Sequence, residues 1–119
     1  MDRLVRYISE DGTFYIIAAD TAETVRRAHE IHGTSPLCSA ALGRLLTAGA
    51  LMSSMLKNDE DSITLRVNGG GPCGTVLAVA EGDGTVRGYI DSPHIVLPLK
   101  GPGKLDVGSG VGKNGSLTV

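Results

Sequence analysis

Residues 36–56 read PLCSAALGRLLTAGALMSSML, and this stretch decides the fold. It follows Ser35, and serine and proline are favoured at the N-cap and the first position of a helix. At about 100° per residue, its apolar side chains point in nearly every direction around the helix axis, and a helix that is apolar all round is buried on all sides. Its small residues let other elements approach closely. The stretch predicts a long helix enclosed within a folded domain.

Arg44 is the charged residue within this helix. A charge inside an apolar helix requires a buried carboxylate or carbonyl partner, unless its side chain reaches the surface. The stretch is about long enough to cross a membrane. However, Arg44 interrupts it, serine and threonine dilute it, and no aromatic belt flanks it. We therefore expect a helix inside a protein domain and no membrane segment.

A second helix is predicted over residues 22–32. Thr21 is a suitable N-cap, and Gly33 supplies a left-handed stop. Its apolar residues form one narrow stripe at a spacing of three, which indicates a helix lying on the surface. That stripe consists of Ala22, Val25, Ala28 and Ile31.

Short strands are expected on both sides of the two helices, in runs rich in β-branched residues and bounded by glycine, proline and aspartate. Asp11-Gly12 and the EGDG at 81–84 predict hairpin turns, and Pro98 places its strand at a sheet edge. The expected strands are 3–8, 13–19, 62–68, 75–80, 85–90 and 94–99, with another beginning at 116–119. Together these elements predict an α+β fold. We expect residues 1–119 to be a single domain, truncated before its last strand or strands.

Composition excludes several classes of protein. Hydrophobic residues make up 41% of the 119 residues, which is typical of a globular domain and excludes disorder. A net charge of −2 and an aromatic content of 3% do not favour binding to nucleic acid. Two cysteines, Cys38 and Cys73, are too few for a disulfide-built secreted domain. Without a secretory signal at the start, the expected setting is the cytoplasm.

Two glycine-rich loops offer an alternative function, a domain that binds a nucleotide or another small molecule. Residues 69–74 match G-x-G-x-x-G, but the next segment resembles a strand and Pro72 lacks an amide. Residues 108–113 resemble a phosphate loop, but Val107 stands at the position of its first glycine and Asn114 at that of its Mg²⁺ ligand. We expect both loops to be connections between elements.

Histidines and cysteines offer a second alternative, a metal site. His29 and His32 are three residues apart on the predicted helix, and Cys38 is the nearest third ligand. Cys73 and His94 are further candidates, although no spacing requires them. Cys38 also lies near a helix N-terminus, which lowers a thiol pKa, but an apolar helix favours a cysteine that acts as a small hydrophobe. We expect no catalytic, cofactor-binding or metal-ligating residue in this chain, and no enzyme.

Three stretches together resemble one protein family: HGTSPLCSAALGRLLTAGALM at 32–52, NGGGPCGTVLAVAEGDGTVRGYI at 68–90, and GKLDVGSGVGKNGSLTV at 103–119. They are similar to the N-terminal domain of the redox-regulated 33-kilodalton heat-shock chaperones of bacteria and organelles. The resemblance implies a three-layer β/α/β core with the helix at about 36–56 between two sheets. It also implies an ATP-independent holdase that binds unfolding client proteins under heat and oxidative stress, and a homodimer.

The sequence departs from this family in one respect. In the family, four C-terminal cysteines arranged as C-x-C and C-x-x-C hold zinc when reduced and form disulfides on oxidation. Cys38 and Cys73 match neither motif, so that switch is not transferred to them. The resemblance implies a chaperone body without its redox sensor, with zinc expected only in the missing C-terminal domain. Such a chain is expected to suppress aggregation in any redox state.

Overall fold

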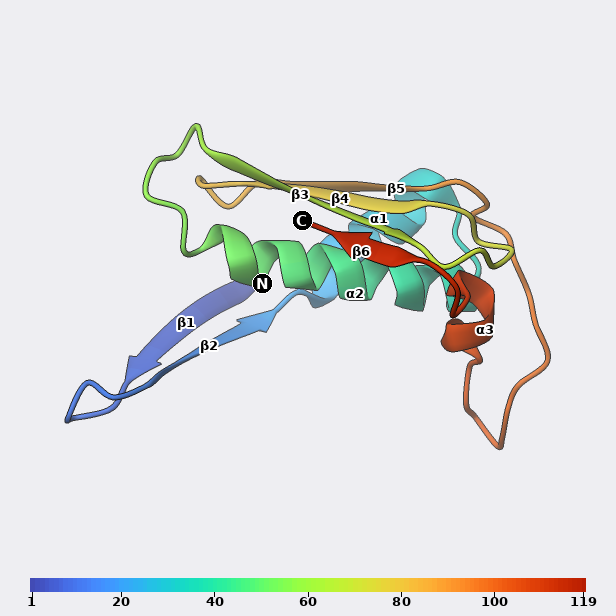
Figure 1. The fold of residues 1–119 in the computed structure, drawn as a ribbon, viewed down its shortest axis with the longest axis horizontal. Helices are drawn as coiled ribbons and strands as arrows, with labels where there is room; N and C mark the ends of the chain where they lie inside the picture. Colours follow the sequence, from blue (N-terminus) through green and yellow to red (C-terminus); the bar gives the residue numbers. More distant parts are fainter.

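The computed structural model describes residues 1–119, which form two antiparallel sheets and three helices (Figure 1). The predicted α+β class is correct. In chain order the elements are β1 (Arg3–Ile8), β2 (Tyr15–Asp20), α1 (Ala22–His32), α2 (Pro36–Ser53), β3 (Ser62–Asn68), β4 (Val76–Glu81), β5 (Val86–Ile90), α3 (Val107–Val111) and β6 (Ser116–Thr118).

The core lies between α2 and a four-stranded sheet of order β5-β4-β3-β6. Helix α2 begins as predicted, with Pro36 at its first turn and the Ser35 hydroxyl accepting the Cys38 amide at 3.2 Å. Leu42 and Leu46 project from α2 towards this sheet and are each only 1% exposed. Burial of leucines of this kind is the main favourable term in folding.

Helix α1 lies on the surface, as its narrow stripe predicts, and none of its residues is fully buried. It ends at Gly33 in the left-handed conformation, also as predicted. Thr21 is the N-cap residue, as predicted, but its hydroxyl makes no capping bond and instead bonds to Thr47 of α2 at 2.7 Å. The Asp2 carboxylate replaces it and accepts the amides of Glu23 and Thr24 at 2.9 and 2.8 Å. A carboxylate at a helix N-terminus also interacts favourably with the helix dipole.

Helix α2 lies between the two sheets, but the expected enclosure on all sides is wrong (Figure 1). The four-stranded sheet covers one side along its length. The β1–β2 hairpin contacts α2 through β2 and then diverges from it. One flank of α2 stays half-exposed, along a groove of about 440 Å³ that includes Ala40, Ala48 and Leu51. A two-stranded hairpin is too narrow to cover a helix of five turns.

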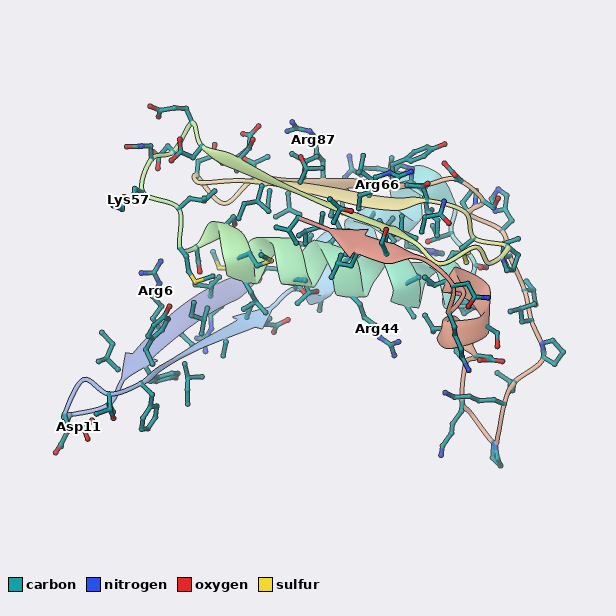
Figure 2. All side chains as sticks on the ribbon, in the orientation of Figure 1. Arg6, Asp11, Arg44, Lys57, Arg66 and Arg87 are labelled. Carbon is teal, nitrogen blue, oxygen red and sulfur yellow. The ribbon has the colours of Figure 1, made fainter.

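Arg44 lies on this open flank and points away from the four-stranded sheet (Figure 2). Its side chain is exposed, so the charge lies at the surface and needs no buried partner. No helix of the structure has the length and apolar character needed to cross a membrane.

The C-terminal third differs from the sequence-based prediction in two elements. Residues 94–99 form no strand. Pro93 precedes this run and Pro98 lies within it. The main chain there instead bonds to the start of α2, where the Ser35 hydroxyl donates to the Ile95 carbonyl at 2.6 Å. The glycine-rich tail contains the short helix α3, which sequence analysis missed. The predicted strand at 116–119 is present as β6 and pairs with β3.

The packing of α2 predicts a large effect of truncating Leu42. Leu42→Ala removes a side chain enclosed between α2 and the sheet, and we expect it to lower the free energy of unfolding by about 2–5 kcal/mol. Leu99→Ala is the matched control, because Leu99 is 55% exposed, and it should change stability by less than about 0.5 kcal/mol. Urea unfolding monitored by circular dichroism measures both, and equal effects would contradict this account of the core.

Candidate functional site

The most unusual surface of the molecule is the β1–β2 hairpin, which projects away from the rest of the chain (Figure 1). The chain has three tyrosines, one phenylalanine and no tryptophan. Tyr7, Phe14 and Tyr15 are on this hairpin, and each is more than half exposed. Ile8 and Ile16 are also more than half exposed. Exposed large apolar side chains that gather in one place mark interaction surfaces.

Both faces of the hairpin are apolar. Side chains alternate between the faces of a strand, and directly paired residues share a face. Tyr7 pairs with Ile16 on one face, and Ile8 pairs with Tyr15 on the other. The Ile8–Tyr15 face meets the end of α2, where the Tyr15 hydroxyl lies 3.5 Å from the Met55 sulfur. Both faces are nevertheless open at this end of the hairpin. Tyr7 and Ile16 are 61% and 54% exposed, and Ile8 and Tyr15 are 74% and 57% exposed.

The turn of the hairpin is held by Asp11. Its carboxylate accepts the Ser9 hydroxyl at 2.7 Å, the Thr13 hydroxyl at 2.8 Å and the Thr13 amide at 3.1 Å. These bonds, the one from Ser9 first, lower the pKa of Asp11 from 3.8 to about 2. The ionised carboxylate therefore fixes the turn from which the Phe14 side chain extends.

The two glycine-rich loops pack against each other, which argues against the predicted alternative of a nucleotide site at 69–74 or 108–113. The amides of Gly71 and Cys73 donate to the carbonyls of Val111 and Gly110, and the Asn114 amide donates to the Gly69 carbonyl. A phosphate cradle needs free amides directed at the ligand. In both loops these groups are already bonded to protein.

The histidines and cysteines of the alternative metal site are not brought together. His29 Nδ1 lies 3.3 Å from the hydroxyls of Thr34 and Ser39. His32 instead lines a hollow of about 540 Å³ between α1 and β5. Cys38 is buried next to Cys73. No three histidine, cysteine or acidic side chains of the chain form a group that can hold a metal ion.

Sequence analysis predicted the hairpin but did not identify it as a site. The available signal was the absence of polar and apolar alternation: Tyr7-Ile8 and Tyr15-Ile16-Ile17 place apolar side chains on both faces. Such a pattern is typical of strands covered on both sides. Only the structure reveals that large side chains on both faces stay more than half exposed.

The bonds at Asp11 predict a pH dependence of the hairpin turn. Because the pKa is lower in the folded chain, the carboxylate stabilises the turn above pH 3.8, and this contribution is lost as the pH falls through about 2. The NMR chemical shift of the Thr13 amide proton should therefore titrate with a midpoint near 2. The Asp11→Ala variant should lose this titration. A midpoint near 4 in the unsubstituted chain would contradict the proposed bonding.

The contact between the loops predicts that Gly71 tolerates no side chain. A Cβ there would lie 2.5 Å from the Gly110 carbonyl oxygen and 2.7 Å from the Gly112 nitrogen, so the two backbones would have to separate. We expect Gly71→Ala to lower the free energy of unfolding by about 1–3 kcal/mol.

Gly108→Ala is the matched control for this substitution. Nothing lies within 4 Å of a Cβ at Gly108, which is in α3 and has no positive φ. Its effect should be between zero and a gain of about 1 kcal/mol. Thermal unfolding of the two variants decides the matter, and a loss at Gly108 as large as that at Gly71 would refute close packing of the loops.

Comparison with known proteins agrees with the resemblance found in the sequence. The sequence profile of the Hsp33 protein family matches residues 2–119. The chain is 50% identical over 118 residues to the 33 kDa chaperonin of Clostridium tetani, and 49% identical over 118 residues to that of Geobacillus sp. (strain WCH70). In both cases 99% of this chain is matched but only 40% of the relative. The chain therefore spans about two-fifths of the length of these relatives.

The fold is similar as well. The crystal structure of the 33 kDa chaperonin (Hsp33 homologue) of Thermotoga maritima superimposes with a TM-score of 0.84 at 30% sequence identity. The match covers 95% of this chain and 43% of that one. Since the family profile extends over nearly every residue described above, the chain belongs to the Hsp33 family.

Proposed function

We propose that this chain is a molecular chaperone of the holdase type, which binds unfolding proteins and prevents their aggregation under heat and oxidative stress. It does so without ATP and catalyses no reaction. Membership of the Hsp33 family and the name of its relatives support chaperone activity. The observation that carries the proposal is the uncovered apolar surface of the β1–β2 hairpin.

The hairpin has the chemistry needed to bind an unfolding client. Aromatic and isoleucine side chains bury large apolar areas on contact with exposed client segments. Because the sheet has only two strands, β1 and β2 each have a free edge with unpaired amides and carbonyls. An extended client segment can pair with such an edge through its own backbone, which does not depend on client sequence. Both contributions suit a protein that accepts many partners.

The hydrogen bonds made by the glycine-rich loops support independence of ATP. The amides of Gly71 and Cys73 donate to carbonyls of the loop at 108–113. The amides of Ser109, Gly110 and Gly112 donate to Asp106 and Gly108, so these amides are not free to bind a phosphate. We propose that the energy for holding a client comes from apolar contact and strand-edge pairing, without nucleotide hydrolysis.

The redox and zinc switch of the full-length protein is proposed to lie outside these residues. The chain contains two cysteines, both fully buried, with no third ligand grouped around them, and this pair does not fit a zinc site. Client holding by the chain is therefore expected in reducing and in oxidising buffer alike. We further propose that the protein acts in the cytoplasm as a homodimer, which light scattering coupled to gel filtration tests.

Light scattering of a heat-unfolded client tests the proposed function. The double variant Tyr7→Ser, Ile16→Ser removes the apolar pair on one exposed face of the hairpin. We expect it to raise the amount of chain needed for half-suppression of aggregation by roughly tenfold, since two buried side chains are lost from the complex. Adding peroxide or dithiothreitol should leave the suppression by the unsubstituted chain unchanged.

Val96→Ser is the matched control, because Val96 is 78% exposed but lies far along the chain from the hairpin. It should suppress aggregation as well as the unsubstituted chain does. Equal losses in Val96→Ser and in the hairpin variant would contradict hairpin-specific binding. Suppression that appears only after peroxide treatment would contradict client holding that does not depend on redox state.

A further inference from the structure

Cys38 and Cys73 form a pair of thiols in the middle of the core. Their Sγ atoms are 4.0 Å apart, although the residues are 35 positions apart in the sequence. Both side chains are 0% exposed, and both are free thiols. Cys38 lies in the first turn of α2, and Cys73 lies in the loop between β3 and β4. The pair therefore joins the start of the central helix to the sheet against which it packs.

The spacing of the two sulfur atoms is compatible with a direct bond. A disulfide holds its sulfur atoms about 2 Å apart, so the two must approach by about 2 Å more. A change of side-chain rotamer moves a Sγ atom by more than this distance. Little movement of α2 relative to the β3–β4 loop is then needed.

The pair is covered by residues 92–97, a segment that belongs to no helix or strand. The Cys38 thiol donates to the Ser92 carbonyl at 3.2 Å, and the Cys73 carbonyl accepts the Ser92 amide at 3.2 Å. Ser35 fixes the same segment, because its amide donates to Pro93 at 2.8 Å and its hydroxyl donates to Ile95 at 2.6 Å. These bonds join the segment to Ser35, Cys38 and Cys73 and belong to no strand pairing, so the segment can separate from α2 while the sheet stays intact.

We propose that Cys38 and Cys73 are an oxidation site that a hydroperoxide converts to an intramolecular disulfide when the segment 92–97 opens. In the closed chain the site is protected. Burial, and then the neighbouring Cys38, raise the pKa of the Cys73 thiol to about 11, so almost none of it is the reactive thiolate at neutral pH. Opening exposes both thiols to water and removes this protection.

The reaction balances with hydrogen peroxide as the oxidant. One thiolate attacks a peroxide oxygen, the O–O bond breaks, and the products are a sulfenic acid and, after protonation, water. The second thiolate then displaces the hydroxyl group from the sulfenic sulfur, forming the S–S bond and releasing a second water molecule. In total two thiols lose two hydrogen atoms and one peroxide becomes two waters. The product links α2 to the β3–β4 loop and constrains the unfolded chain.

Intact mass spectrometry of the peroxide-treated chain tests the proposal. The expected product is a monomer lighter than the reduced chain by two hydrogen atoms, which dithiothreitol restores, with a higher midpoint of thermal unfolding than the reduced form. Cys73→Ser should abolish this product. A gain of oxygen atoms, a disulfide-linked dimer, or an unfolding midpoint no higher after oxidation would each overturn it.

The dependence of the oxidation rate on urea tests the role of the segment. If opening is local, the rate stays constant at low urea, whereas a rate that rises with the full slope of global unfolding would overturn the gate. Ser35→Ala removes both the bond to Ile95 and the cap on the Cys38 amide, which hold the segment and the first turn of α2 together, and should accelerate oxidation about fivefold. Ser54→Ala, which loses a hydroxyl bond to Leu51 at the other end of α2, is the matched control and should not. Equal acceleration in both variants would also count against the gate.

Discussion

Contact between one face of α2 and the four-stranded sheet is the constraint on which the rest of the structure depends. Leu42, Leu46 and the sheet residue Leu65 fill this interface and are almost completely buried. The same helix positions the other parts of the chain. Its first turn anchors the segment 92–97 through Ser35, and its Leu37 packs against the loop that contains Gly110. Because these contacts converge on α2, its position organises both the glycine-rich loops and the thiol pair.

The two sheets cover α2 to different extents, and this difference connects the fold to the proposed function. The four-stranded sheet covers one side of α2 and forms the hydrophobic core with it. The hairpin supplies a projecting side, which touches α2 near Met55 and leaves the face of Tyr7 and Ile16 open. An isolated two-stranded hairpin is marginally stable in water. A rigid body that carries an apolar and locally adjustable surface is well suited to hold client segments of different sequence.

Much of the fold could be predicted from the sequence because its signals are local. Ser35 and Pro36 mark the start of α2, and the narrow stripe of α1 indicates its place on the surface. The predictions that failed concern features set by contacts between residues distant in the sequence. Asp2 precedes β1, and the pairing of β1 with β2 brings it next to the start of α1, so no local pattern at Thr21 could indicate it. The main chain of residues 94–99 bonds to α2 in place of a neighbouring strand, and the exposure of the hairpin depends on what lies next to it in space.

Hydrogen exchange of the backbone amides, followed by NMR, tests the central claim most directly, because it measures the stability of α2 and the hairpin separately. If α2 and the four-stranded sheet form the cohesive core, the slowest amides lie in α2, β3 and β4 and exchange only when the whole chain unfolds. The amides of β1 and β2 then exchange much faster, through local opening. Equal protection of the hairpin and α2, or faster exchange in α2 than in β1 and β2, would contradict this account.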